Sequence, residues 1–171
     1  MKVLVTGAAG FIGGQLCHAL WKRGDTVVGI DNFSYGNLDN LRFEDHDFGP
    51  EVLRMDIRDR EKLPELFEKE RFDVVYNIAG IAPLPDCQSD PVEAVSVNTL
   101  GLVNLLELCR RHGVKHLVQA STNAMYENET EFPTVEDKFN APTLIYPSTK
   151  YCAEQFCRSF AETYSMNVTC L

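Results

Sequence analysis

The sequence predicts an α/β protein whose parallel sheet is covered by helices on both faces. Short runs rich in valine, leucine and isoleucine alternate with stretches of helical spacing along the whole chain. This pattern is typical of a parallel sheet with crossover helices. The first apolar run also leads through a glycine-rich turn, VTGAAGFIGG, into a helical pattern. With 171 residues, 44% hydrophobic and 24% charged, the chain has the size and composition of one globular domain.

Each expected element follows from local spacing. Strands are expected at residues 2–6, 26–31, 51–56, 73–80, 115–121 and 167–171, where aliphatic and β-branched residues cluster. Helices are expected at 11–23, 58–71, 91–112 and 144–165, where apolar residues recur at helical spacing. The polar connection 32–50 is expected to hold a short helical turn at 38–43. A longer polar segment, 126–142, follows the fifth strand, where a loop is placed to line a ligand crevice.

The glycine-rich turn has two interpretations. Gly7, Gly10 and Gly13 stand between a strand and a helix, where glycines let backbone N–H groups reach a phosphate at the positive end of the helix. The same residues also suit an ordinary tight turn. The rest of the chain has to decide between a phosphate cradle and a turn.

Polar residues at the ends of the next strands favour the cradle. Asp31 ends the second strand, 18 residues after Gly13, where a carboxylate accepts hydrogen bonds from the ribose of a dinucleotide. No arginine or lysine follows in residues 32–34, which favours NAD over NADP because a 2′-phosphate would meet only negative charge. Asp56 follows the third strand, where it is placed to accept from the adenine amino group, and the small residues of 77–80 end the fourth.

A second group of polar residues lies where a catalytic site would be expected. Ser121 and Thr122 end the fifth strand, and Tyr146 and Lys150 are four residues apart at the start of a helix, hence on one face. A tyrosine with its reference pKa near ~10 is a poor base at neutral pH. One cation at ~5 Å supplies roughly 3 kcal/mol toward the phenolate. Taken alone, this pair is also compatible with two ordinary exposed helical residues.

Composition excludes several classes of function. Lysine plus arginine is 16 and aspartate plus glutamate is 25, a formal charge of −9, which opposes binding to nucleic acid or to an anionic membrane. No apolar run approaches the ~20 residues of a membrane span, and no signal peptide is expected. Six cysteines without Cys-x-x-Cys spacing predict free thiols in a reducing compartment, the cytoplasm. His112 and His116 are separated by Gly113, so we expect no metal site.

The order of the motifs identifies a family. TGAAGFIG, Asp31, DIRD, NIAG, VNTLGLVN, STNAMY and YPSTK together resemble the extended short-chain dehydrogenase/reductase family, in its NAD-dependent sugar-nucleotide epimerase/dehydratase branch. The resemblance implies a Rossmann-type doubly wound sheet with strand order 3-2-1-4-5-6 and a tightly held NAD, so that the glycine turn is a phosphate cradle. The cofactor-binding residues that it implies are Gly7, Gly10, Phe11, Ile12, Gly13, Asp31, Asn32, Asp56, Ile57, Ala79, Gly80, Asn98, Tyr146 and Lys150. The implied catalytic residues are Thr122, Tyr146 as the base and Lys150 as its electrostatic partner.

Departures from the family pattern narrow the reaction. Asn123 and Ala124 stand where similar dehydratases carry an Asp-Glu pair, so epimerisation of a nucleotide-sugar is favoured, most simply a UDP-sugar 4-epimerase. Ala82 stands where the epimerases often have lysine, and Glu127 replaces a usual glycine. The alternatives are a dehydratase, decarboxylase or reductase of the same family, or a non-catalytic NAD-binding module.

The resemblance also bears on domains and assembly. Residues 1–171 are expected to form the NAD-binding domain with the catalytic Tyr/Lys pair, truncated before a C-terminal substrate domain. The helix 91–112 is apolar around nearly its whole circumference, and such a helix is normally buried on both sides. We therefore expect a homodimer through the helices 91–112 and 146–164, with no nucleic acid or membrane as partner.

Overall fold

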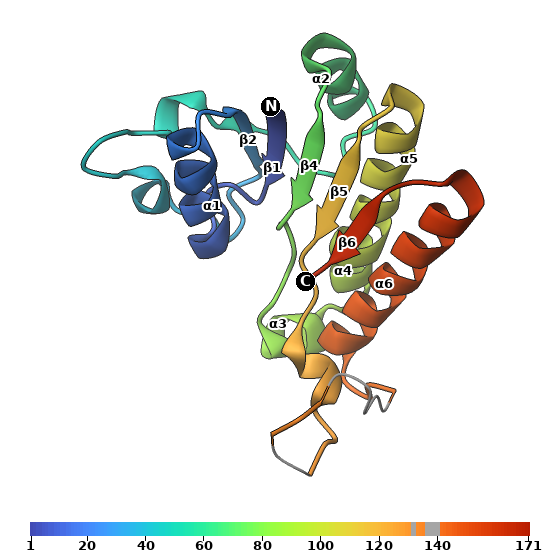
Figure 1. The fold of residues 1–171 in the computed structure, drawn as a ribbon. Helices are drawn as coiled ribbons and strands as arrows, with labels where there is room; N and C mark the ends of the chain where they lie inside the picture. The colour runs from blue at the N-terminus through green and yellow to red at the C-terminus, as the bar shows by residue number, and fades with distance from the viewer. Residues whose placement is uncertain (131–132, 136–140) are drawn as a thin grey trace.

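The computed structural model describes residues 1–130, 133–135 and 141–171. Six parallel strands form one sheet in the order β3-β2-β1-β4-β5-β6 (Figure 1). This arrangement confirms the predicted α/β class, the Rossmann-type topology and the strand order. Part of the predicted polar segment 126–142, namely 131–132 and 136–140, lies outside the described residues.

The strands are β1 (Lys2–Thr6), β2 (Thr26–Asp31), β3 (Leu53–Arg54), β4 (Val74–Asn77), β5 (His116–Gln119) and β6 (Val168–Cys170). All six occur where predicted, but β3, β4, β5 and β6 are shorter than expected, β3 and β4 most of all. β3 has two residues instead of six because it lies at the edge of the sheet and pairs only with β2, which leaves Leu53 43% exposed. β4 ends at Asn77 because the next amide in reach, that of Ala79, donates to the Thr6 hydroxyl (3.2 Å) rather than to a neighbouring strand.

The helices are α1 (Phe11–Lys22), α2 (Lys62–Glu70), α3 (Leu84–Ser89), α4 (Pro91–Val95), α5 (Leu102–His112) and α6 (Ile145–Tyr164). A π-helical segment, Ser96–Gly101, joins α4 to α5, so the predicted helix 91–112 is continuous but not uniform. Short 3₁₀ turns lie at Leu38–Leu41 (η1), Gly49–Glu51 (η2) and Asn123–Tyr126 (η4). The turn predicted at 38–43 is therefore confirmed, whereas α3 was not predicted.

Successive side chains along β1 point to opposite faces of the sheet, so the core is divided between the two faces. Val3 and Val5 pack with Cys17 and Leu20 of α1, whereas Leu4 packs with the helices on the other side. Figure 1 shows α1 on one side of the sheet and α2, α5 and α6 on the other. Helices on both faces are thus confirmed, and the sheet is buried as parallel sheets require.

The helix 91–112 is long and apolar enough to cross a membrane by length and composition alone, with a mean hydropathy of 1.3. In the fold, however, 56% of the apolar stretch of this helix is buried, and Leu102, Leu105 and Leu106 are fully enclosed in the core. The helix is thus largely a core helix. Its exposed apolar residues are confined to the first half, at Val92 and Val95 of α4 and Leu100 of the π segment.

Candidate functional site

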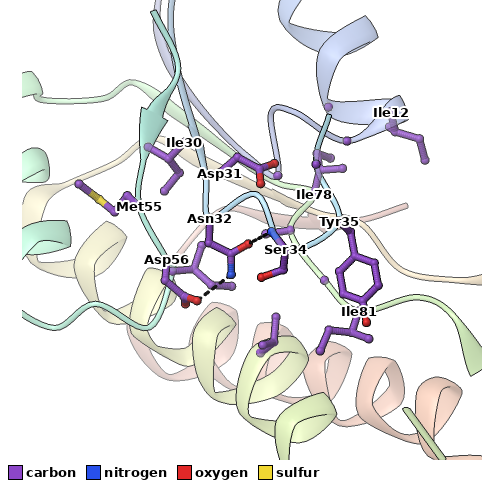
Figure 2. Close-up of a pocket in the computed structure, with 18 of the residues that line it drawn as sticks. Ile12, Ile30, Asp31, Asn32, Ser34, Tyr35, Met55, Asp56, Ile78 and Ile81 are labelled. Atoms are coloured by element: carbon purple, nitrogen blue, oxygen red, sulfur yellow. Dashed lines mark hydrogen bonds between the residues drawn. The ribbon is translucent and has the colours of Figure 1, made fainter. Parts of the chain in front are cut away.

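A cavity of about 640 Å³ lies at the carboxyl ends of β1, β2, β3 and β4. This is the crevice in which open α/β sheets bind ligands, and its volume lies within the usual range for a ligand site. Eleven of the predicted cofactor-binding residues line it: Gly7, Gly10, Phe11, Ile12, Gly13, Asp31, Asn32, Asp56, Ile57, Ala79 and Gly80. Figure 2 shows several of these side chains, with Ile12 at one end and Asp56 at the other.

The glycine turn has the close backbone approach of a phosphate cradle. Gly7 has a φ of +67°, and a Cβ there would lie 2.8 Å from the backbone of Ala79. A Cβ on Gly13 would lie only 2.0 Å from the Gly7 carbonyl oxygen, so the first turn of α1 is pressed against the loop. The 12-residue helix α1 begins at Phe11 with no acidic residue in its first turn. Its N-terminal amides are thus available to an anion.

Asp31 fixes this turn to β2. It is 7% exposed, and its carboxylate accepts from the Ala9 amide (2.9 Å) and the Phe33 amide (2.7 Å). Each oxygen retains a lone pair for a further donor. No lysine or arginine is among the described residues that line the cavity, so the charge of Asp31 is not offset there by a cation.

The Asp56 carboxylate already accepts more hydrogen bonds within the protein than the sequence suggested. Its oxygens accept from Asn32 Nδ2 (2.9 Å), from the Arg58 amide (2.8 Å) and from two nitrogens of the Arg58 guanidinium (2.9 and 2.8 Å). The Arg58 side chain lowers the pKa of Asp56 to about 2, so the carboxylate is charged at neutral pH. Arg58 also binds Glu93 (2.7 Å). An adenine amino group at this end of the cavity would share Asp56 with these donors.

A row of buried and partly buried hydrogen bonds crosses the sheet from β1 to β5 and on to α6. The Thr6 hydroxyl donates to Asn77 Oδ1 (2.6 Å), and Asn77 Nδ2 donates to Gln119 Oε1 (2.7 Å). Gln119 Nε2 then donates to the Ala120 carbonyl (2.7 Å), which also accepts from Lys150 Nζ (3.0 Å). The row therefore connects the strand before the glycine turn with the predicted catalytic lysine.

The predicted catalytic residues lie beyond the cavity wall rather than in it. Lys150 is 4% exposed, and a Cβ on Gly80 would lie 3.3 Å from its Nζ, so the lysine stands directly behind a lining glycine. Burial lowers the pKa of Lys150 to about 8. Tyr146 lies one turn earlier on α6 and is half-buried. The Thr122 hydroxyl accepts from the Ala124 amide (3.1 Å) and caps η4, which packs against α6.

Asn98 does not line the cavity but clamps the loop that does. Its Oδ1 accepts from the Ile81 amide (2.8 Å), and its Nδ2 donates to the Ile81 carbonyl (3.0 Å) and to the Thr149 hydroxyl (3.0 Å). The side chain is 2% exposed. Asn98 thus holds the segment after β4 against α6, next to Lys150.

Glu127, which the sequence left unexplained, binds the N-terminus of α6. Its Oε1 accepts from the amide (2.5 Å) and hydroxyl (2.9 Å) of Thr143 and from the Leu144 amide (3.1 Å). These donors lower the pKa of Glu127, as expected for a carboxylate at the positive end of a helix. The residue ties the segment after Thr122 to the helix that carries Tyr146.

Ile78, in the predicted segment 77–80, also lines the cavity, and sequence reasoning missed eight lining residues: Ile30, Ser34, Tyr35, Gly36, Met55, Ile81, Glu93 and Val97. Most of them directly flank the predicted ones in the chain. Their position after strands β2, β3 and β4 is the signal that would have found them. Glu93 and Val97 come from α4 and the π segment, and only the fold brings them to the cavity.

Comparison with known proteins places the chain in a family. Residues 3–171 match the NAD dependent epimerase/dehydratase family. The chain is 34% identical to UDP-glucuronate 4-epimerase 4 of Arabidopsis thaliana, over 99% of the chain and 40% of that protein. It is 32% identical to UDP-glucose 4-epimerase of Mycolicibacterium smegmatis, over 98% of the chain and 53% of that protein. The chain therefore spans about half the length of the curated relatives it matches.

Solved structures agree with this assignment. UDP-glucose 4-epimerase of Thermotoga maritima, solved with UDP-glucose, superposes with a TM-score of 0.91 at 31% identity, over 99% of this chain and 54% of that one. The UDP-glucose 4-epimerase of Thermus thermophilus, solved with NAD, gives a TM-score of 0.89 at 34% identity, over 99% of this chain and 54% of that one. By sequence and by fold, the chain belongs to the NAD-dependent epimerase/dehydratase family.

Proposed function

We propose that the chain binds NAD in the 640 Å³ cavity and provides the cofactor and proton-transfer half of a nucleotide-sugar epimerase, specifically a UDP-sugar 4-epimerase. The observation that carries the proposal is the meeting of three features at one cavity. The glycine cradle and Asp31 line it, and Lys150 stands directly behind Gly80. Relatives solved with NAD and with UDP-glucose support the same assignment.

The cradle suits a pyrophosphate, and Asp31 suits an unmodified ribose. Backbone amides at the start of α1 supply the donors, since the described lining residues include no cation. Asp31 would accept from ribose hydroxyls and repel a 2′-phosphate. We therefore expect NAD to bind more tightly than NADP. Calorimetric titration of both cofactors tests this, and equal or tighter binding of NADP would contradict it.

Asp31→Asn provides the matched comparison. It removes the charge and keeps one acceptor oxygen, so it retains the bond from either the Ala9 or the Phe33 amide, which Asp31 now holds with one oxygen each. The preference for NAD should become smaller in this variant. A preference that stays unchanged would place the discrimination elsewhere in the cavity.

Tyr146 and Lys150 supply the proton chemistry. In its oxidised form NAD accepts a hydride from a sugar carbon and returns it. Tyr146 takes the proton of the sugar hydroxyl as a general base, and the charge of Lys150 stabilises the phenolate form. In this proposal, Thr122 hydrogen-bonds the same sugar hydroxyl. Tyr146 would give the proton back to the sugar oxygen, and return of the hydride to the opposite face of the sugar would invert the centre.

Tyr146→Phe tests the assignment of the base. The substitution removes only the proton-accepting oxygen, so NAD affinity should stay within about twofold while turnover of UDP-sugars falls by ~10²–10⁴. The assay uses a panel of UDP-, GDP- and dTDP-sugars, with any C-terminal continuation that the gene encodes included in the protein. Unchanged turnover in Tyr146→Phe would rule out this tyrosine as the base.

A non-catalytic NAD-binding module is the second candidate, because the chain spans about half of its relatives' length. Substrate positioning supplies ~7–11 kcal/mol of a barrier, so we expect the 171 residues alone to bind NAD and to interconvert sugars barely or not at all. Robust epimerisation by these residues alone would refute this. A dehydratase is less consistent with the chain, since Asn123 and Ala124 provide no acid next to Thr122.

We also propose a homodimer in a reducing compartment, the cytoplasm. Val92, Val95 and Leu100 are 80%, 49% and 53% exposed on one helix, and Phe156 of α6 is 42% exposed. A two-fold axis beside these helices would bury the apolar side chains in a four-helix interface. All six cysteines are free, four of them buried, which is consistent with a reducing environment.

A further inference from the structure

Two elements that flank the glycine turn are joined across it by one hydrogen bond. The Tyr35 hydroxyl, in the segment after β2, donates to Asp86 Oδ2 of α3 at 2.6 Å. In the sheet, β2 and β4 lie on either side of β1, and α3 follows β4. The segments that carry Tyr35 and Asp86 therefore stand on opposite sides of the turn after β1, and their bond spans it.

Tyr35 lies at the rim of the cavity. It lines the cavity and is nevertheless 55% exposed, so one side of the ring faces the interior and the other faces solvent. Figure 2 shows the ring extending toward Ile81, a lining residue of the opposite wall. The hydroxyl thus reaches from one wall of the cavity to the other.

The segment that carries Tyr35 is held firmly on the glycine turn. The Asn37 amide and Asn40 Nδ2 both donate to the Ala9 carbonyl (2.9 and 2.8 Å). Gly36 fits so closely that a Cβ there would lie 2.7 Å from Ala9 and 2.8 Å from the Asp31 carboxylate. The base of the segment is therefore fixed, which leaves the Tyr35 side chain as the part able to swing.

The opposite end of the bond is also held in place. In α3, the residue after Asp86 is the fully buried Cys87, whose thiol donates to the Ile81 carbonyl (3.4 Å). Ile81 is in turn clamped by Asn98. Asp86 therefore projects from an element that is fixed to the cavity wall.

We propose that the Tyr35–Asp86 hydrogen bond is a latch over the cofactor cavity, which sets how fast NAD enters and leaves. This inference rests on the proposed function, in which the pyrophosphate lies on the glycine turn and hence beneath the bond. The latch is closed before and after NAD binds and has to open for passage in either direction. It therefore slows association and dissociation together and changes the affinity little.

Stopped-flow measurements of Tyr35→Phe, Asp86→Ala and the double variant test the latch. NADH is the fluorescent probe for the association rate, and its displacement by excess NAD gives the dissociation rate. Each single variant should raise both the association and the dissociation rate by roughly tenfold, the scale of one hydrogen bond to a charged group. The dissociation constant should change by less than about threefold. The double variant should exchange no faster than the single variants, because all three lack the same bond.

Tyr164→Phe is the matched control, since Tyr164 is 49% exposed at the end of α6, and it should leave both rates unchanged. Circular dichroism and the melting temperature verify that each variant folds. Unaltered exchange rates in Tyr35→Phe would overturn the latch and leave the proposed function standing. Weaker binding in Tyr35→Phe but not in Asp86→Ala would replace the latch with a direct contact between Tyr35 and NAD. If the unaltered chain fails to bind NADH or NAD at all, the proposed function and the latch are both refuted.

Discussion

Replacing Lys150 with methionine should stabilise the protein at neutral pH. Lys150 is 4% exposed, and its Nζ donates to a neutral carbonyl, that of Ala120. Burial lowers its pKa from the ordinary 10.5 to about 8, and only the nearby Cys87 thiol acts in the opposite direction. At about 1.36 kcal/mol per pH unit, that interval means that the buried charge costs about 3 kcal/mol of folding free energy. Methionine keeps the length of the side chain and removes the charge.

The effect should depend on pH in a defined direction. Below pH 8 Lys150 is protonated in both the folded and the unfolded chain, so the full cost is present. Between pH 8 and 10.5 the unfolded chain binds more protons than the folded one, so the stability contributed at this site rises with pH. The free energy of unfolding of Lys150→Met should therefore exceed that of the unaltered protein by about 2 kcal/mol at pH 7, after about 1 kcal/mol is allowed for the lost hydrogen bond. The advantage should disappear near pH 10.5.

Urea unfolding at pH 7 and pH 10.5, followed by the fluorescence of the single tryptophan Trp21, measures this difference. Lys115→Met is the control, because Lys115 is 75% exposed and pairs with Asp73 at the surface, and it should change the stability little and similarly at both pH values. A gain in Lys150→Met that is the same at both pH values, or a loss at pH 7, would refute the reasoning. In the proposed function the same variant loses the partner of Tyr146, so it should be more stable and less active.

Three further outcomes follow from the described contacts. Gly13→Ala should weaken NAD binding by more than ~100-fold in calorimetry, because its Cβ would lie 2.0 Å from the Gly7 carbonyl oxygen. Gly10→Ala should bind NAD nearly normally, because its Cβ would lie 3.2 Å from the same oxygen. Similar losses of affinity in both variants would contradict this. Glu127→Gly should speed hydrogen exchange of the Thr143 and Leu144 amides just before α6, with the glutamine variant in between, and unchanged exchange would show that the carboxylate is dispensable. Leu100→Glu should shift the proposed homodimer to monomer in sedimentation equilibrium, since Leu100 is 53% exposed on the apolar face; an unaltered protein that is already monomeric would remove that proposal.

The features that the sequence predicted are those carried by local patterns. The glycine turn and Asp31 were found because a strand, a turn and a helix follow each other within a few residues, and the fold places them at one cavity. The position of β3 was found but its length was not, because an edge strand receives hydrogen bonds from one side only. α3 was missed because it has only six residues, too few for a helical period to show, and prolines stand at its N-cap and in its first turn.

Other parts of the site depend on contacts between distant segments. The bond between Tyr35 and Asp86 joins residues 51 positions apart, and neither side chain has a local spacing that points to the other. Glu127 was recognised as unusual, but its role requires the segment before α6, where Thr143 lies 16 residues further along the chain. Such features are determined by tertiary packing, which local periodicity does not encode.

The π-helical segment Ser96–Gly101 changes which side chains the helix presents to solvent. In an uninterrupted α-helix, residue 99 would share a face with Val92 and Val95, because positions four and seven residues apart align. Here Thr99 is 9% exposed and Leu100 is 53% exposed, so the wider turn rotates the following residues by about one position. Thr99 faces inward, where its hydroxyl donates to the Thr149 carbonyl of α6 (3.2 Å), and Leu100 extends the outer apolar stripe. One wide turn thus determines which side chains the helix presents on two surfaces, with the polar Thr99 against α6 and the aliphatic Leu100 on the exterior.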